Sequence, residues 1–324
     1  MQYAQIKKIP NVEIQDIFTG NGASELIQMS LHALVNDGDE VLIPSPDYPL
    51  WTACVNLAGG KAVHYICDEQ SEWYPDLADI ESKVTPKTKA IVVINPNNPT
   101  GALYPKEILE GIVDIARRHQ LILFSDEIYD RLLLDGKTHT SIASISGDIP
   151  VITFNGLSKS HVICGFRSGW MTVSGDTSRC DDFISGLIAL AAMRLCAGAL
   201  MQLVIPAALS DFESTKEMIV PGGRLFEQRE AACSAIDKTD TLSVVKNSAA
   251  FYIFPKLDAK RHNITDDRKF ARDLLREKKI LIVPGSGFDW PIPDHFRVVM
   301  LPEAKTLHRA MLDIGDFLEN YKQQ

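Results

Sequence analysis

One lysine and one arginine stand beside apolar runs, at positions where enzymes often keep charged groups. Lys159 comes soon after the run VITFN (151–155), and Arg167 stands eight residues later, just before GWMTV (169–173). A lysine that is partly desolvated at a strand end has a lowered pKa, which makes its amine a nucleophile towards aldehydes. A single such lysine is more often a solvated loop residue, so the neighbouring groups decide the interpretation.

Further polar side chains stand at the ends of other apolar runs. Asp126 closes the run LILFSD, Tyr129 follows it, and Asn98 lies in a loop rich in asparagine and proline. Tyr48 stands between two prolines, where a stiff ring can stack on a flat ligand. The ordinary alternatives are a helix cap for Asp126 and a packed loop residue for Tyr48.

Small residues open a helix near the N-terminus. Ala23 and Ser24 follow the sequence GNG, and backbone N–H groups at such a helix start can approach a phosphate. A dinucleotide site is disfavoured because Glu25 replaces the third glycine of its pattern. The acidic pair Asp39 and Glu40 also begins the next apolar run, whereas a ribose-binding carboxylate ends it. The pattern therefore favours a monophosphate site, with a simple tight turn as the alternative.

The elements expected to position these groups alternate along the first two-thirds of the chain. The expected strands are 16–19, 40–44, 61–66, 89–95, 121–126, 151–155 and 169–173, and the clearest helices are 24–35, 105–119 and 181–195. Continuous apolar strands separated by helices indicate an α/β fold, with a mostly parallel sheet that has helices on both faces and binds ligands at the carboxyl ends of its strands. The last third has an α+β pattern. We therefore predict a large domain over 1–215 and a small C-terminal domain over 216–324.

The groups at the strand ends are the set that pyridoxal phosphate requires. That cofactor needs a lysine for a Schiff base, an acidic partner for its pyridine nitrogen and a phosphate site. Four motifs occur in order along the chain: NPNNPTG (95–101), SDEIY (125–129), SK (158–159) and GFRSGW (165–170). With this combination the chain resembles the class I/II pyridoxal-phosphate aminotransferases of fold type I.

Longer stretches narrow the resemblance. NGLSKSHVICGFRSGW, MRLCA, PGGRLFEQR and PDHFRVVMLP are similar to the bacterial glutamate–pyruvate (alanine) aminotransferases, and the similarity extends through essentially all 324 residues. It implies transamination between an amino acid, with alanine as the expected donor, and 2-oxoglutarate, giving pyruvate and glutamate. It also implies a homodimer, for which the apolar stretch 183–195 offers a surface.

The resemblance implies roles around the cofactor ring. Lys159 would form the Schiff base and, once displaced, move the substrate proton. Asp126 would keep the pyridine nitrogen protonated, while Tyr129 and Asn98 would donate to the phenolic oxygen. Tyr48 would stack on the ring face.

It also implies anion-binding roles. The phosphate would be held by the backbone amides of Ala23 and Ser24, the hydroxyl of Ser158 and the guanidinium of Arg167. Arg297, together with Asn98, would bind the substrate carboxylate, because a guanidinium forms a two-pronged contact that lysine cannot imitate. Without the motif context, Arg297 would equally well be an arginine at a strand edge in a surface ion pair.

The sequence departs from the family in three places. Gly156 stands where many relatives have a serine or threonine ligand of the phosphate, GAL follows MRLCA where an asparagine and a proline are commoner, and relatives carry a segment ahead of the position of Met1. We therefore expect an N-terminally truncated aminotransferase that by itself binds the cofactor weakly, transaminates slowly and tends to aggregate.

Composition limits the possible partners. Thirty-three Lys and Arg against 42 Asp and Glu leave a net charge of −9, which argues against nucleic acid and anionic membranes. The six cysteines show no paired spacing, as expected of reduced thiols in the cytoplasm. The stretch 183–209 is interrupted by charged and proline residues, so we expect no membrane span, and no residue pattern predicts a metal site.

Other functions remain open at this stage. A β-lyase or decarboxylase would use the same cofactor and lysine, because only orientation about the substrate Cα selects the bond that breaks. A non-enzymatic remnant that binds the cofactor is a second alternative, and a nicotinamide dehydrogenase is a third that Glu25 disfavours.

Overall fold

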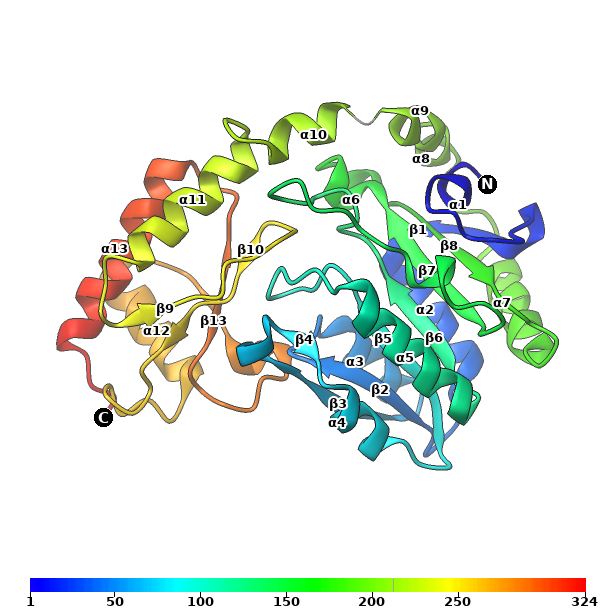
Figure 1. The fold of residues 1–324 in the computed structure, drawn as a ribbon, viewed down its shortest axis with the longest axis horizontal. Coiled ribbons are helices and arrows are strands. Elements are labelled where there is room, and N and C mark those ends of the chain that lie inside the picture. The colour runs from blue at the N-terminus through cyan, green and yellow to red at the C-terminus, as the bar shows by residue number, and fades with distance from the viewer. Residues whose placement is uncertain (212) are drawn as a thin grey trace.

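An eight-stranded sheet forms the centre of the larger part of the molecule in the computed structural model, which describes residues 1–211 and 213–324 (Figure 1). The strands lie in the order β1-β8-β7-β6-β5-β2-β3-β4. Their bounds are β1 (Ile17–Asn21), β2 (Glu40–Ser45), β3 (Lys61–Asp68), β4 (Tyr74–Pro75), β5 (Thr88–Ile94), β6 (Ile122–Asp126), β7 (Val151–Gly156) and β8 (Ser168–Ser174).

The sheet is mostly parallel, which confirms the prediction. β3, β2, β5, β6 and β7 run parallel to one another, whereas β8 is antiparallel to both β7 and β1, and β4 is antiparallel to β3. All seven predicted strands form within a few residues of their expected bounds. The two-residue β4 was not predicted because it is too short to show a pattern.

Helices cover both faces of the sheet, as the continuous apolar strands require. Alternate residues of β5 separate the two cores, since Ile91 and Val93 belong to one and Val92 and Ile94 to the other. The helices that pack into the first core are α4 (Leu77–Lys83) and α5 (Lys106–His119). Those that pack into the second are α2 (Ala23–Leu34), α3 (Leu50–Leu57) and α7 (Asp181–Arg194). The short helices are α1 (Gln2–Ile6), α6 (Leu157–Ser160), η1 (Ile14–Asp16), η2 (Glu69–Ser71), η3 (Ile142–Ser144) and η4 (Cys164–Phe166).

The apolar stretch 183–209 is broken into three helices. α7 ends at Arg194, the next residue Leu195 has a positive φ of 70°, and α8 (Ala199–Gln202) and α9 (Ile205–Ser210) follow. Within the described residues, none of the helices has the length and apolar character needed to cross a membrane. Several large apolar side chains of this region face solvent: Ile188, Met193, Leu195, Leu200 and Leu203.

The C-terminal part has its own sheets and helices, coloured yellow-green to red in Figure 1. A three-stranded sheet has the order β10-β13-β12, and a two-stranded sheet pairs β11 with β9. The elements are α10 (Glu213–Ile219), α11 (Arg224–Ile236), β9 (Leu242–Ser243), β10 (Tyr252–Ile253), β11 (Lys256–Leu257), α12 (Asp267–Lys278), β12 (Val283–Pro284), η5 (Gly285–Phe288), β13 (Phe296–Val299) and α13 (Ala304–Asn320). This agrees with the expected α+β pattern.

The core of the C-terminal part also takes residues from the larger part. Ile128, Tyr129 and Leu132, from the loop after β6, pack into it together with the helices and strands of the C-terminal third. Met218 and Ile219 of α10 pack against the same core. A domain boundary at residue 216 stays a prediction.

Candidate active site

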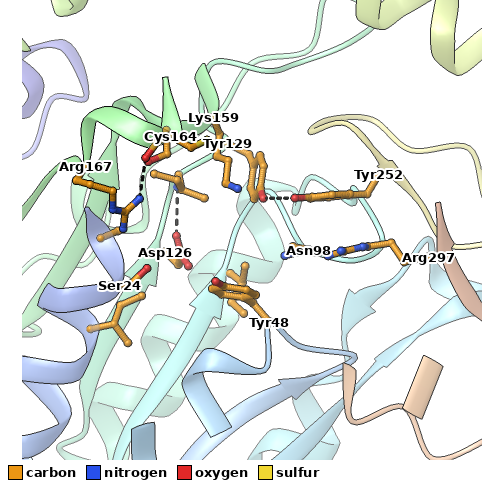
Figure 2. A pocket seen from close by; sticks show the side chains of 15 residues that line it. Ser24, Tyr48, Asn98, Asp126, Tyr129, Lys159, Cys164, Arg167, Tyr252 and Arg297 are labelled. Atoms are coloured by element: carbon orange, nitrogen blue, oxygen red, sulfur yellow. Dashed lines mark hydrogen bonds between the residues drawn. The ribbon is translucent and has the colours of Figure 1, made fainter. Parts of the chain in front are cut away.

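A cavity of about 270 Å³ lies at the carboxyl ends of β5, β6 and β7, between the larger part and the C-terminal part (Figure 2). All ten residues singled out from the sequence line it: Ala23, Ser24, Tyr48, Asn98, Asp126, Tyr129, Ser158, Lys159, Arg167 and Arg297. Sequence reasoning missed five lining residues: Ile27, Ile94, Ile128, Cys164 and Tyr252. The parallel strands explain the convergence, because their ends meet at one edge of the sheet.

Lys159 projects into this cavity from α6, the short helix that follows β7 (Figure 2). Its side chain is partly buried, and its Nζ lies 5.9 Å from the centre of the Phe251 ring. Among the described residues the ammonium group has no hydrogen bond or ion pair. Burial is the main cause that lowers the pKa of Lys159, and the charges of Arg297 and Arg167 act in the same direction, against Cys164 and Asp126. The amine is therefore available to react with an aldehyde.

Asp126 ends β6 and is almost completely buried at the floor of the cavity. Trp51 Nε1 donates to Oδ2 over 3.3 Å, and the Ile128 backbone N–H donates to Oδ1 over 3.3 Å. Burial raises the pKa of Asp126 to about 6, although these two donors and the charge of Lys159 oppose it. The indole of Trp51 is held between Phe124 and Phe154, with ring centres 5.8 and 5.4 Å away. No local pattern marked Trp51 as a donor, because its partner lies 75 residues away in the chain.

At one end of the cavity, the guanidinium of Arg167 lies next to the N-terminus of α2, so this end is positively charged. Arg167 Nη2 donates to the Asn21 carbonyl over 3.0 Å, and Nη1 donates to the Cys164 carbonyl over 2.9 Å. Gly22 caps α2 with a φ of +80°, and a Cβ there would lie 2.3 Å from Arg167 Nη2. Glycine thus lets the guanidinium approach the first turn of α2, where Ala23 and Ser24 present backbone N–H groups. A helix start beside a guanidinium suits a phosphate.

Arg297, on β13, lies at the opposite end of the cavity (Figure 2). Its guanidinium is 4.6 Å from the ring centres of both Tyr252 and Phe288, and Nη1 donates to Asn98 Oδ1 over 3.0 Å. Burial lowers the pKa of Arg297, and its buried Nε has no partner among the described residues. This arrangement leaves the Asn98 amide nitrogen to donate to a ligand and the guanidinium to receive a carboxylate.

Only one of the three loop asparagines reaches the cavity. Asn95 Oδ1 accepts from the Tyr104 backbone N–H over 2.9 Å, and Asn97 Oδ1 accepts from the Thr100 hydroxyl over 2.9 Å. These two shape the loop, and Asn98 alone lines the cavity.

Two tyrosine hydroxyls share a hydrogen bond at the cavity wall. Tyr129 Oη and Tyr252 Oη are 2.8 Å apart, and burial raises the pKa of both phenols. Tyr48 lines the cavity below them, partly buried (Figure 2). Tyr252 was missed because it lies in the run AAFYIFPKL, where its apolar neighbours make it indistinguishable from a core residue.

The residues present fit pyridoxal phosphate. Lys159 supplies an unengaged amine, and the buried Asp126 supplies an acceptor for a ring N–H. Arg167 beside the start of α2 suits the phosphate, and its hydrogen bonds to the Asn21 and Cys164 carbonyls hold that guanidinium in place. Arg297, at the far end of the cavity, provides a guanidinium that can bind a substrate carboxylate.

A dinucleotide site does not fit. Glu25 forms an ion pair of 2.6 Å with Arg194 and accepts from the Asn21 backbone N–H, so it fixes the turn before α2. Glu40 begins β2 and pairs with Lys61, at the end of the strand opposite to the cavity.

The chain is similar to known aminotransferases over its whole length. The family model described as aminotransferase class I and II matches residues 1–313. The glutamate-pyruvate aminotransferase AlaA of Escherichia coli K12 is 52% identical over 323 residues, which cover 100% of this chain and 80% of that protein. The alanine aminotransferase of Mycobacterium tuberculosis H37Rv is 49% identical over 322 residues, 99% of this chain and 75% of that protein.

A solved structure has the same fold. The crystal structure of an aminotransferase from Escherichia coli superposes with a TM-score of 0.98 at 52% identity, covering 100% of this chain and 80% of that chain. The fold expected from the sequence is therefore confirmed.

Proposed function

This chain belongs to the class I and II aminotransferase family, whose members use pyridoxal 5′-phosphate, and we propose that it transfers the amino group of alanine to 2-oxoglutarate. The observation that carries this proposal is the single cavity in which the unengaged amine of Lys159 lies between Asp126, Arg167 and Arg297. Relatives named glutamate-pyruvate and alanine aminotransferases, about half identical in sequence, support these substrates.

The chain's own residues hold the cofactor in this proposal. The backbone amides of Ala23 and Ser24, the Ser158 hydroxyl and Arg167 bind the phosphate. Tyr48 contacts the ring face.

The remaining polar groups tune the ring and the reaction. Bound pyridoxal phosphate supplies an electrophilic carbon for the amino group and an electron sink that labilises bonds at the substrate Cα. Asp126 holds a proton at the pyridine nitrogen, and Tyr129 and Asn98 donate to the phenolic oxygen. Lys159 Nζ would anchor the cofactor and, once freed, would carry the proton from the substrate Cα to the cofactor's C4′ in one half-reaction and from C4′ to Cα of the second substrate in the other.

Arg297 orients the substrate. Its guanidinium binds the α-carboxylate through two parallel hydrogen bonds, and Asn98 fixes the plane of that fork through its bond to Nη1. Tyr252 and Phe288 enclose the guanidinium, and this reduces the water that competes for the carboxylate. Because Arg297 lies on β13 and Lys159 on α6, the substrate bridges the two parts of the chain.

The proposal includes a homodimer in the cytoplasm. Exposed apolar residues on α7, directly after it and on α8, among them Met193, Leu195 and Leu200, support a surface that a second copy covers. Six cysteines without disulfides support a reducing compartment. Light scattering at micromolar concentration tests the dimer, and a monomer there would refute it.

A product assay tests the reaction. The purified chain loaded with cofactor is given L-alanine and 2-oxoglutarate, and we expect pyruvate and glutamate in equal amounts. A β-lyase needs a leaving group at Cβ, which alanine lacks, so a parallel assay uses L-serine, and ammonia and pyruvate from it would indicate a β-lyase. Carbon dioxide from alanine would indicate a decarboxylase, and no product from a yellow, cofactor-loaded chain would indicate a non-catalytic binding protein. Each of these results would refute the transaminase proposal.

A further inference from the structure

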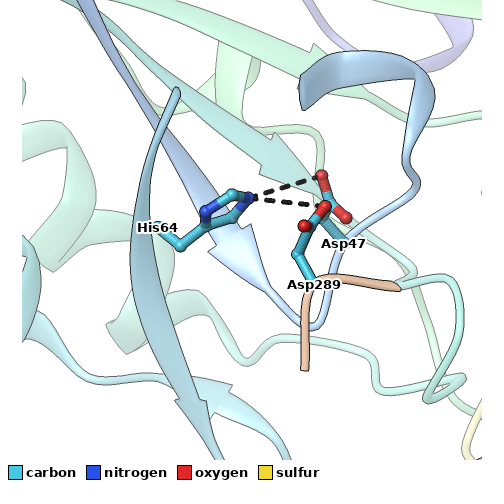
Figure 3. A group of neighbouring side chains, drawn as sticks. All are labelled: Asp47, His64 and Asp289. Atoms are coloured by element: carbon cyan, nitrogen blue, oxygen red, sulfur yellow. Dashed lines mark ion pairs between the residues drawn. The ribbon is translucent and has the colours of Figure 1, made fainter. Parts of the chain in front are cut away.

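Three metal-ligating side chains from distant parts of the chain meet beside the cavity, at a place that none of the proposed catalytic roles uses (Figure 3). Asp47 follows β2, His64 lies on β3 and Asp289 directly follows η5. One ligand atom from each lies within 4.8 Å of the other two. His64 Nε2 is 3.9 Å from Asp47 Oδ2 and 3.7 Å from Asp289 Oδ2.

Asp47 has no exposed surface, yet its carboxylate is only half satisfied. Oδ2 accepts from the Thr52 hydroxyl over 2.8 Å, while Oδ1 is buried without a partner among the described residues. Oδ2, rather than Oδ1, is the oxygen that faces His64, and a dashed line in Figure 3 marks this contact. Burial raises the pKa of Asp47 to about 6; the nearby charge of Asp289 adds to this, and the contacts with His64 and Thr52 oppose it. A buried polar atom of this kind needs a partner.

The cluster lacks positive charge. In the part of the chain that the structure describes, neither carboxylate pairs with a lysine or an arginine, and His64 is the shared neighbour of both. Two carboxylates placed this close favour a bound cation, since each raises the cost of ionising the other.

We infer that Asp47, His64 and Asp289 bind a divalent transition-metal ion of the zinc type, with water completing its coordination. One imidazole nitrogen and two carboxylate oxygens are a donor set that zinc and its neighbours accept, whereas Mg²⁺ and Ca²⁺ prefer oxygen ligands alone. Metal–ligand distances of about 2.0–2.2 Å place tetrahedral ligands about 3.3–3.6 Å apart. The two separations from His64 need to shorten by only a few tenths of an ångström.

The ligands are held in place by their surroundings. The Asp47 backbone N–H donates to the Phe288 carbonyl over 2.9 Å, and the Ser45 hydroxyl donates to the Asp289 carbonyl over 2.7 Å. These bonds fix the turn that carries Asp289 against the end of β2. Thr52 Oγ1 also lies 2.9 Å from His64 Nε2, so metal binding would replace that contact and keep the Thr52–Asp47 hydrogen bond.

Solvent reaches one side of the cluster. The side chains of His64 and Asp289 are 26% and 38% exposed, whereas that of Asp47 is fully buried. An ion can therefore enter from the exposed side and keep water ligands there. The inference does not depend on the transaminase proposal, because none of the three ligands lines the cavity around Lys159.

Metal titration of the full chain with cofactor bound tests the inference. Calorimetry with Zn²⁺ and absorption spectroscopy with Co²⁺ should each give one ion per chain, without the sulfur-to-cobalt charge-transfer band that a cysteine ligand produces. His64→Gln should weaken binding at least about 100-fold, since even outer partners of metal ligands contribute about 10–100-fold. Thr52→Val, which removes such an outer partner, should weaken it about 10-fold.

Two further variants make the result unambiguous. His308→Gln removes a histidine at the surface of α13 and should leave the affinity unchanged. Asp289→Asn keeps the shape of a partly exposed side chain and serves if His64→Gln fails to fold; it should weaken binding at least about 10-fold. No stoichiometric binding to the unmodified chain, equal binding by the ligand variants, or a sulfur charge-transfer band would each overturn the inference.

Discussion

Asp126 and Asp47 are both buried next to strand ends of the same sheet, and burial raises the pKa of each to about 6. Their neighbours differ. Two N–H donors and the amine of Lys159 surround Asp126, whereas a hydroxyl, an imidazole and a second carboxylate surround Asp47. Asp126 faces the cavity, and Asp47 faces a cluster with access to solvent.

The difference shows that burial by itself does not identify a ligand. Burial is the largest cause that raises the pKa of both carboxylates, but the geometry of the neighbours decides which cation completes each site. Fixed N–H donors leave one edge of Asp126 for a flat N–H donor such as a protonated pyridine. An imidazole and two carboxylates converge on a point, which suits an ion.

The largest expected effect is that of Lys159→Ala, which should abolish function in the cavity and leave the Asp47 cluster unchanged. Lys159→Ala should lower kcat/KM for transamination at least about 10⁴-fold, because it removes both the covalent anchor and the base. The affinity of the Asp47 cluster for Zn²⁺ should not change. Lys106→Ala, which removes a surface lysine paired with Glu110, is the control. Cofactor that borohydride still fixes to the Lys159→Ala protein would contradict the assignment.

Arg297→Lys tests the carboxylate end of the cavity. We expect kcat/KM for alanine and for 2-oxoglutarate to fall about 100-fold, mainly through a higher KM. Lysine keeps the positive charge but cannot form the two parallel hydrogen bonds of a guanidinium to a carboxylate. Cofactor binding should change little. Arg309→Lys, on the surface of α13, controls for the substitution itself. An unchanged KM for both substrates would show that another group binds the carboxylate.

The stability of the chain free of cofactor and metal should depend on both aspartates. In the unfolded chain each carboxyl titrates near 3.8, and in the folded chain near 6. Between these values the folded state binds more protons, so the free energy of unfolding falls as the pH rises from about 4 to about 6, by up to about 3 kcal/mol for each group.

Asparagine substitutions should flatten that decline. The asparagine in Asp126→Asn and in Asp47→Asn stays neutral at every pH. In urea unfolding curves, each variant should therefore lose its own contribution to the decrease of the unfolding free energy between about pH 4 and about pH 6. Asp316→Asn, at an exposed position, should leave that decrease unchanged. Added cofactor should change only the contribution of Asp126 to this pH dependence, and added Zn²⁺ should change only the contribution of Asp47. A profile that keeps its slope in both variants would be evidence against the raised pKa values.

The smallest effect concerns the indole that holds Asp126. Trp51→Phe keeps an aromatic ring against Phe124 and Phe154 and loses one hydrogen bond to a carboxylate. We expect the cofactor Kd to rise about 10-fold, the value for one bond of about 1.5 kcal/mol. Trp170→Phe is the matched control, since Trp170 Nε1 has no hydrogen-bond partner among the described residues. Equal Kd values for the two variants would exclude a role for the indole N–H.

The amino-acid sequence by itself determined the sheet and most of the cavity. Continuous apolar runs identify the central strands, and the ends of parallel strands meet at one edge, so Asp126, Asn98 and Lys159 were bound to lie together. The motif resemblance added Arg297, whose strand belongs to the C-terminal part and whose place no periodicity predicts.

Only the tertiary structure decided the contacts that complete the two sites. Trp51 reaches Asp126, Tyr252 reaches Tyr129, and residues 47, 64 and 289 converge because β2 and β3 are adjacent and η5 packs against the end of β2. These side chains lie on different elements, and no local pattern of apolar and polar residues records how elements dock. Hydrophobic periodicity reports which face of an element is buried, whereas the partner that a buried polar atom meets depends on packing between segments far apart in the chain.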